Sequence, residues 1–235
     1  MSLKAVLFDV DFTLVRPGPQ LGPEGYVRAG RRYGLDLDPA KYDDARERAL
    51  ESLQRDPDLR HDEEIWIAFT ERIVRGMGGD AEAARRCAVD IERAWERSEN
   101  FSLYEDALPV LDELRSHELK IGLVSNGARD LPEFVRHHGL EVDAAVASRA
   151  HGKVKPDPTI FEAALSTLEV AAEEAVMVGD SLEDDVEGAR ALGIKAILVD
   201  REGRYADVED RLTDLYGLPA ALGLQPAARR APPSG

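Results

Sequence analysis

The chain has 235 residues, 43% of them hydrophobic and 32% charged, which suits a soluble globular protein with one medium domain or a core domain with an insertion. Its formal net charge of −16 disfavours nucleic-acid partners, and its single cysteine, Cys87, excludes an internal disulfide or a cysteine-rich metal site. No apolar run approaches the roughly 18 residues that span a membrane and no signal peptide is visible, so we expect a cytoplasmic protein without a membrane partner.

The first element is an apolar run, residues 5–8, followed by two acids, Asp9 and Asp11. The run is typical of a buried parallel strand. Because side chains alternate along an extended chain, both carboxylates leave on the same side, roughly 7 Å apart. Two acids at the end of a buried strand are costly without compensation, which a divalent cation would provide. Acids that cap the next turn are the alternative interpretation.

Residues 22–100 have a different pattern, in which apolar residues recur at helical spacing and strand-like runs are absent. The pattern predicts helices near 23–34, 40–54, 62–77 and 80–98. We therefore expect a helical cap domain at 17–103, inserted into an α/β core domain made of 1–16 and 104–221. Residues 222–235 have the composition of a flexible tail.

After the insertion, helices and strands alternate. Strands are predicted at 120–125, 144–147, 175–179 and 195–199, and helices at 107–117, 129–138, 158–168, 183–192 and 206–216. This alternation favours an α/β fold with a doubly wound parallel sheet and right-handed crossovers. Ligands of such sheets bind beyond the carboxyl ends of the strands, where Ser125, Asn126 and Asp180 fall together with Asp9 and Asp11.

Two segments after the predicted strands have residues suited to binding phosphate. Ser125-Asn126-Gly127 offers a hydroxyl and backbone N–H groups for a phosphate oxygen, although it is also an ordinary turn sequence. In the segment 152–161, Pro156 holds Lys155 extended, and a fixed lysine there would neutralise a carboxylate and a phosphoryl group together. Lys153 is a second candidate, and a solvated lysine is the alternative.

A fourth segment repeats the pattern of a buried strand that ends in an acid. Residues 175–179 precede Asp180, and Ser181 and Asp184 are placed to favour the start of the next helix. If the strands before Asp9 and Asp180 are neighbours, these two carboxylates face each other.

Together the four segments resemble the haloacid dehalogenase (HAD) superfamily, specifically its phosphatase-type members with a helical cap inserted after the first motif. The matching motifs are Asp9-x-Asp11-x-Thr13, Ser125-Asn126-Gly127, Lys155-Pro156-Asp157-Pro158 and Gly179-Asp180-Ser181-x-x-x-Asp185. The resemblance implies the strand order 5-4-1-2-3, which makes the strands before Asp9 and Asp180 neighbours. One departure is Phe12, which stands where glycine is usual in this family and whose bulky side chain is expected to narrow the substrate's entry or to pack under the cap.

The resemblance implies catalytic roles for residues of the first and third motifs. Asp9 is expected to be the nucleophile that forms an aspartyl-phosphate. Asp11 is expected to protonate the leaving oxygen and then to activate water. Lys155 would orient Asp9 and offset charge, and Thr13 would help to position the loop.

The resemblance also implies a magnesium site and a phosphate site. Asp9, Asp180 and the backbone carbonyl of Asp11 would hold Mg²⁺, and Asp185 would hold its water shell or orient Asp180. The residues expected to bind the phosphoryl oxygens are Ser125 and the backbone of Asn126 and Gly127.

The implied function is a Mg²⁺-dependent phosphatase acting on a small phosphate monoester, with the cap selecting the substrate. A 2-haloacid dehalogenase is one alternative, although the family's dehalogenases lack a second acid like Asp11. A phosphomutase and a non-catalytic binding protein are the others. Candidate ligands for a substrate anion are Arg16 at the expected hinge and the cap's Arg28, Arg31, Arg32, Arg60 and His61.

Overall fold

The computed structural model describes residues 2–54, 63–127, 129–208 and 211–225. The chain forms two compact units, a core unit of Met1–Arg16 and Leu103–Gly235 and a helical unit of Pro17–Ser102. Arg60, His61 and residues 226–235 of the expected tail lie outside the described residues. Within the described ranges, every helix is too short or too polar to cross a bilayer.

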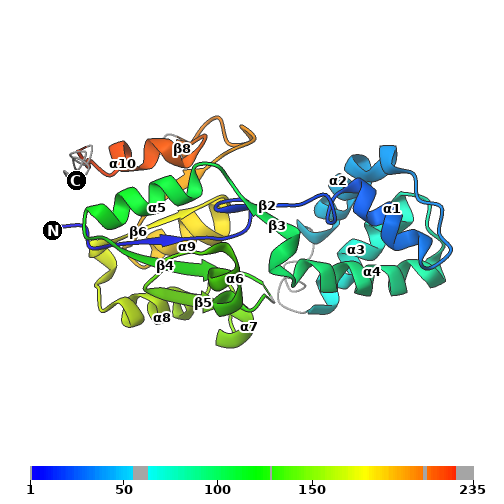
Figure 1. Ribbon diagram of the computed structural model, residues 1–235, viewed down its shortest axis with the longest axis horizontal. Helices are drawn as coiled ribbons and strands as arrows, with labels where there is room; N and C mark the ends of the chain where they lie inside the picture. Colours follow the sequence, from blue (N-terminus) through cyan, green and yellow to red (C-terminus); the bar gives the residue numbers. More distant parts are fainter. Residues whose placement is uncertain (1, 55–62, 128, 209–210, 226–235) are drawn as a thin grey trace, which may run out of the picture. The chain divides into compact units, whose positions relative to one another are not determined.

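The described part of the core unit is built on a six-stranded parallel sheet (Figure 1). Its strands are β1 (Ala5–Phe8), β4 (Lys120–Ser125), β5 (Ala144–Ala147), β6 (Ala175–Gly179), β7 (Lys195–Val199) and β8 (Arg211–Leu212). Their spatial order is β5-β4-β1-β6-β7-β8. The strand order implied by the resemblance is therefore confirmed, and β1 and β6, which precede Asp9 and Asp180, are neighbours.

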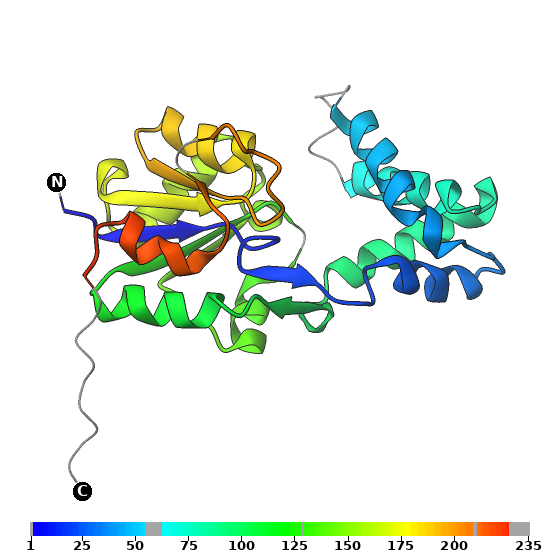
Figure 2. The same ribbon diagram turned by 90° about the horizontal axis from the view of Figure 1, so that it is seen from above.

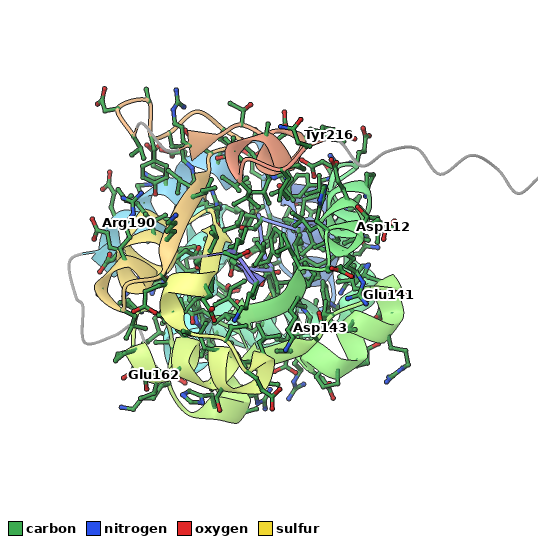
Figure 3. All side chains as sticks on the ribbon, turned by 90° about the vertical axis from the view of Figure 1, so that its left-hand side faces the viewer. Asp112, Glu141, Asp143, Glu162, Arg190 and Tyr216 are labelled. Carbon is green, nitrogen blue, oxygen red and sulfur yellow. The ribbon has the colours of Figure 1, made fainter. Side chains whose placement is uncertain are left out.

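Helices cover both faces of this sheet. They are α5 (Ala107–Ser116), α6 (Leu131–His138), α7 (Ser148–His151), α8 (Pro158–Leu168), α9 (Gly188–Ala191) and α10 (Leu218–Ala221). Figure 2 shows α5 on one side of the sheet and α8 and α9 on the other. All four residues of β1 are buried, because this central strand is covered on both faces. Exposed charged side chains such as Asp112, Glu162 and Arg190 surround this interior (Figure 3).

The helix predicted at 206–216 is wrong for the part of that range that the structure describes. Residues there form β8 and a 3-10 turn, Leu215–Gly217. The segment before β8 folds instead around the fully buried Asp200, whose carboxylate accepts hydrogen bonds from the N–H of Arg204 (2.8 Å) and of Tyr205 (2.9 Å). Arg211 also donates to this carboxylate at 3.0 Å. A buried acid surrounded by donors overrides the local helical pattern.

The helical unit contains all four helices predicted for the insertion. Its described helices are α1 (Pro23–Arg31), α2 (Tyr42–Gln54), α3 (Glu63–Gly76) and α4 (Ala81–Trp95), with a 3-10 turn at Pro39–Lys41. Asp80 caps α4 by accepting hydrogen bonds from two N–H groups of its first turn. Cys87 is buried in the apolar interior of this unit, as its sequence context predicted.

Two short strands that the sequence pattern did not predict lie where the chain passes between the units. β2 (Val15–Pro17) and β3 (Phe101–Leu103) pair as a two-stranded sheet. Strands of three residues are too short to give a readable alternation of polar and apolar side chains.

Candidate active site

The site is built at the carboxyl ends of β1, β4 and β6, with Asp9 directly after β1. The N–H of Asp9 donates to the carbonyl of Val178 on β6 at 2.9 Å, which extends the strand pairing to the acid itself. The buried Lys155 places its Nζ 2.6 Å from Oδ1 of Asp9 and 2.6 Å from Oδ1 of Asp185. Lys153, the other lysine of this segment, is exposed.

Lys155 carries a positive charge in this environment. Burial lowers the pKa of its ammonium, but the charges and hydrogen bonds of Asp185 and Asp9 outweigh burial and raise that pKa above its ordinary value. Lys155 is therefore a permanent cation between two carboxylates.

Three acids of the site form one cluster. Asp9, Asp180 and Asp185 each offer a carboxylate oxygen, and these oxygens all lie within 4.8 Å of one another. Burial raises the pKa of Asp180 to about 8, with the charges of Asp9 and Asp185 acting in the same direction. Burial also raises the pKa of Asp185 to about 6, against the pull of Lys155. The cluster thus concentrates more negative charge than Lys155 offsets, and an all-oxygen donor set of this kind fits a hard divalent cation such as Mg²⁺.

The position of Asp185 depends on the absence of a side chain at Gly179. Asp185 is buried, and its Oδ2 accepts a hydrogen bond from the N–H of Ser181 at 3.0 Å. A Cβ on Gly179 would lie 2.1 Å from that Oδ2 and 2.3 Å from the Cγ of Asp185. Only glycine leaves room for the carboxylate under the end of β6.

Gly179→Ala is therefore expected to destabilise the protein by roughly 1–3 kcal/mol, because the added methyl group overpacks a buried site. Urea denaturation measures this loss. Gly22→Ala is the matched control, since a Cβ on Gly22 meets nothing within 4 Å. Equal stability of the two variants would contradict the steric argument.

The carboxylate of Asp11 does not belong to the acidic cluster and has a partner of its own. Its Oδ1 accepts a hydrogen bond from Nη2 of Arg129 at 2.9 Å. Burial raises the pKa of Asp11, Arg129 opposes this shift, and the charge of Asp9 adds to it. Arg129 is buried, with its guanidinium 5.1 Å from the ring centre of Phe134. No motif in the sequence singles out Arg129, although it lies four residues after Ser125.

Phe12 adopts a backbone conformation that favours glycine. Its φ is 63°, and its N–H donates to the carbonyl of Val15 at 2.7 Å, closing the tight turn after Asp11. This turn gives a physical reason for the glycine that is usual at the matching family position.

We expect Phe12→Gly to give a more stable protein than Phe12→Val, by roughly 1–2 kcal/mol, because a β-branched residue is strained at positive φ. Valine retains more apolar surface, so burial alone predicts the opposite order. Comparing the urea midpoints of the two variants decides between the backbone explanation and the burial explanation. A more stable valine variant would contradict the backbone explanation.

The turn after β4 is tied to the segment that carries Lys155. The side chain of Asn126 accepts a hydrogen bond from the N–H of Lys155 (2.7 Å) and donates to its carbonyl (3.0 Å). The N–H of Gly127 donates to Oγ of Ser148 at 3.0 Å, so this predicted phosphate donor already has an acceptor here. Ser125, the last residue of β4, is buried.

The loop after the first motif is held by Arg201, a residue outside all four motifs. Nη2 of Arg201 donates to the carbonyl of Thr13 at 2.8 Å, and its guanidinium forms a two-pronged ion pair with Asp106 at 2.9 and 3.0 Å. Thr13 is fully buried, and its expected part in positioning this loop stays a prediction. No local motif marks Arg201, because its partners lie far away in the sequence.

The candidate anion ligands are spread over both units. Arg16 is exposed, with its guanidinium 5.7 Å from the ring centre of Tyr104. In the helical unit, Arg28 donates to the carbonyl of Pro19, and Arg32 forms an ion pair with Asp90. Their binding of a substrate stays a prediction.

Comparisons with known proteins agree on one family. A family model described as haloacid dehalogenase-like hydrolase matches residues 3–193. A glyceraldehyde 3-phosphate phosphatase from Methanopyrus kandleri is 32% identical over 220 residues, which are 90% of each chain. A solved HAD phosphatase from Thermococcus onnurineus is 29% identical with a TM-score of 0.66, covering 96% of this chain and all of that one. A 2-haloacid dehalogenase from Pseudomonas syringae is 26% identical with a TM-score of 0.61, covering 94% and 98%. The chain therefore belongs to the haloacid dehalogenase-like hydrolase family and is an enzyme of that family.

Proposed function

We propose that this enzyme is a phosphatase that hydrolyses a small phosphate monoester with Mg²⁺ through an aspartyl-phosphate on Asp9. The observation that carries the proposal is the cluster of Asp9, Asp180 and Asp185 around Lys155. A phosphate dianion is repelled by such a cluster unless cations offset its charge, and a divalent ion with Lys155 would do so. The phosphatases among its relatives support the same reaction.

The proposed reaction has two steps. In the first, a carboxylate oxygen of Asp9 forms a bond to phosphorus as the bond to the leaving oxygen breaks, and Asp11 donates a proton to that oxygen. In the second, Asp11 takes a proton from water as the water attacks the phosphorus, which releases phosphate and restores Asp9. Lys155 remains protonated throughout and offsets the charge on Asp9.

Magnesium would be held by Asp9, Asp180 and the backbone carbonyl of Asp11. When bound, it would offset negative charge between the incoming phosphate and Asp9. Asp185 already accepts hydrogen bonds from Lys155 and from the N–H of Ser181, which supports an orienting or water-mediated role rather than direct coordination. The Ser125 hydroxyl and the backbone of residues 126–127 would bind phosphoryl oxygens, the latter if Gly127 exchanges its contact with Ser148 for the substrate.

We further propose that the helical domain, residues 17–103, acts as a cap that selects the substrate and excludes water. Small, phosphorylated metabolites such as the triose phosphate named for the M. kandleri relative are the first substrates to test. The cytoplasmic location expected from the sequence remains a prediction.

A 2-haloacid dehalogenase is the second candidate, and the similarity to the P. syringae enzyme favours it. Dehalogenation needs a carboxylate nucleophile but neither a leaving-group acid nor a metal. Asp9 would serve as that nucleophile, but Asp11 and Asp180 would have no role, so these two acids favour the phosphatase.

The deciding experiment measures phosphate release from glyceraldehyde 3-phosphate, sugar phosphates, phosphoglycolate, nucleoside monophosphates and a chromogenic aryl phosphate, with Mg²⁺ and with a chelator. We expect release that depends on Mg²⁺. Halide release from 2-chloropropionate, measured in parallel without phosphatase activity, would make the protein a dehalogenase. Phosphoryl transfer within a sugar phosphate without free phosphate would make it a mutase.

A further inference from the structure

Lys155 must reach two carboxylates from a segment that has no regular secondary structure. It lies in the turns between α7 and α8, yet its Nζ is 2.6 Å from both Asp9 and Asp185. A displacement of about 1 Å in a reacting group can cost on the order of 100-fold in rate. The backbone of Lys155 therefore needs a support outside its own segment.

The side chain of Asn126 contacts both polar groups of the Lys155 backbone. Its Oδ1 accepts from the N–H at 2.7 Å, and its Nδ2 donates to the carbonyl at 3.0 Å. One planar amide that both donates and accepts sets the position and the orientation of the bound residue, as an adjacent strand does in a sheet. Asn126 directly follows β4, so the sheet fixes the position of Asn126 itself.

We infer that Asn126 is the positioning residue for Lys155, acting through its side chain rather than only through its backbone N–H. The inference rests on the proposed function, in which Lys155 offsets charge at Asp9. It also couples two parts of the site, because Asn126 belongs to the turn expected to bind the phosphoryl group. The Asn126 amide thereby sets the distance between this turn, residues 125–127, and Lys155.

Ser148, the first residue of α7, provides a matched comparison, because it binds the turn at residues 126–127 without a hydrogen bond to Lys155. Its Oγ accepts from the N–H of Gly127 at 3.0 Å. A general loosening of the turn should follow from Ser148→Ala as well as from Asn126→Ala. A specific effect on Lys155 should follow only from the change at Asn126.

The first test is a double-mutant cycle on kcat/KM for phosphate release. We expect Asn126→Ala to lower kcat/KM by roughly 10- to 100-fold in the wild-type background. In a Lys155→Ala background the same change should cost less than about twofold, since residues that act as one unit are not additive. If Asn126→Ala lowers kcat/KM by the same factor in the wild-type and Lys155→Ala backgrounds, the inference is overturned.

The second test needs no enzymatic activity. An amine-reactive reagent followed by peptide mass spectrometry reports how accessible Lys155 is, with the exposed Lys153 as internal reference. Asn126→Ala should raise labelling of Lys155 severalfold relative to Lys153, and Ser148→Ala should leave it at the wild-type level. Asn126→Ser is a second variant, because its hydroxyl is too short to reach both backbone groups.

The two tests separate the inference from the function on which it rests. If the wild-type protein releases no phosphate from any substrate, the proposed function fails and the labelling ratio still decides the role of Asn126. Labelling of Lys155 that is unchanged in folded Asn126→Ala and Asn126→Ser, or raised equally by Ser148→Ala, would overturn the positioning role. Circular dichroism checks that each variant is folded.

Discussion

Asp9→Asn is expected to lower phosphate release by about 10⁴-fold or more, because an amide cannot attack phosphorus as a carboxylate does. The substitution keeps the shape of the side chain, and Lys155 keeps its ion pair with Asp185. The loss should therefore appear in kcat with the fold intact. Initial rates on the best substrate of the panel, together with thermal denaturation, measure both quantities.

The matched control is Asp112→Asn, which removes a carboxylate from the exposed face of α5 (Figure 3). Its activity should stay within twofold of the wild-type enzyme. Acid-quenched wild-type enzyme should carry one additional phosphoryl group by mass spectrometry during turnover, and Asp9→Asn should carry none. Substantial turnover by a folded Asp9→Asn protein would rule out Asp9 as the nucleophile.

Lys155→Met is expected to impair both catalysis and stability. Methionine has a similar length but no charge, so the buried Asp9 and Asp185 lose their shared cation. Breaking a buried ion pair from one side typically costs about 3–5 kcal/mol. Activity should fall by on the order of 10³-fold, a loss comparable to that of one preorganised electrostatic contact. Lys153→Met, which changes the exposed neighbour, should alter stability by less than about 0.5 kcal/mol.

The cost of Lys155→Met should depend on pH in a known direction. Burial already raises the pKa of Asp185 to about 6, so above that pH the ionised carboxylate costs stability in the folded protein relative to the unfolded chain. Without Lys155 the pKa of Asp185 should rise further. The difference in unfolding free energy between wild type and variant should thus be largest near pH 7.5 and shrink toward pH 5, where Asp185 takes up a proton. Urea denaturation in chelator across this range measures it, and a difference that grows on acidification would contradict the pairing.

Short segments of the sequence were sufficient to predict the sheet and the position of the site. The continuous apolar run before Asp9 and the alternation after residue 107 each depend on residues close together in the chain. The parallel sheet then follows from general rules of connection, and its carboxyl edge gathers Asp9, Ser125 and Asp180. The strand order itself came from the family resemblance.

Local sequence patterns gave a wrong prediction where a distant partner sets the conformation. Residues 206–216 have a helical pattern, but the buried carboxylate of Asp200 organises the segment before β8. Phe12 was noted as an unusual residue, but its positive φ becomes visible only in the turn itself.

The amino-acid sequence on its own thus specified the strands of the sheet up to residue 199 and the chemical groups at their ends, because those features depend on neighbouring residues. Only the tertiary structure decided how the groups are paired. Arg129 meets Asp11 across 118 positions of the chain, Asn126 meets the backbone of Lys155 across 29, and Gly179 makes room for Asp185. These contacts depend on how separate strands and loops pack in space, and no periodicity within one segment records that packing.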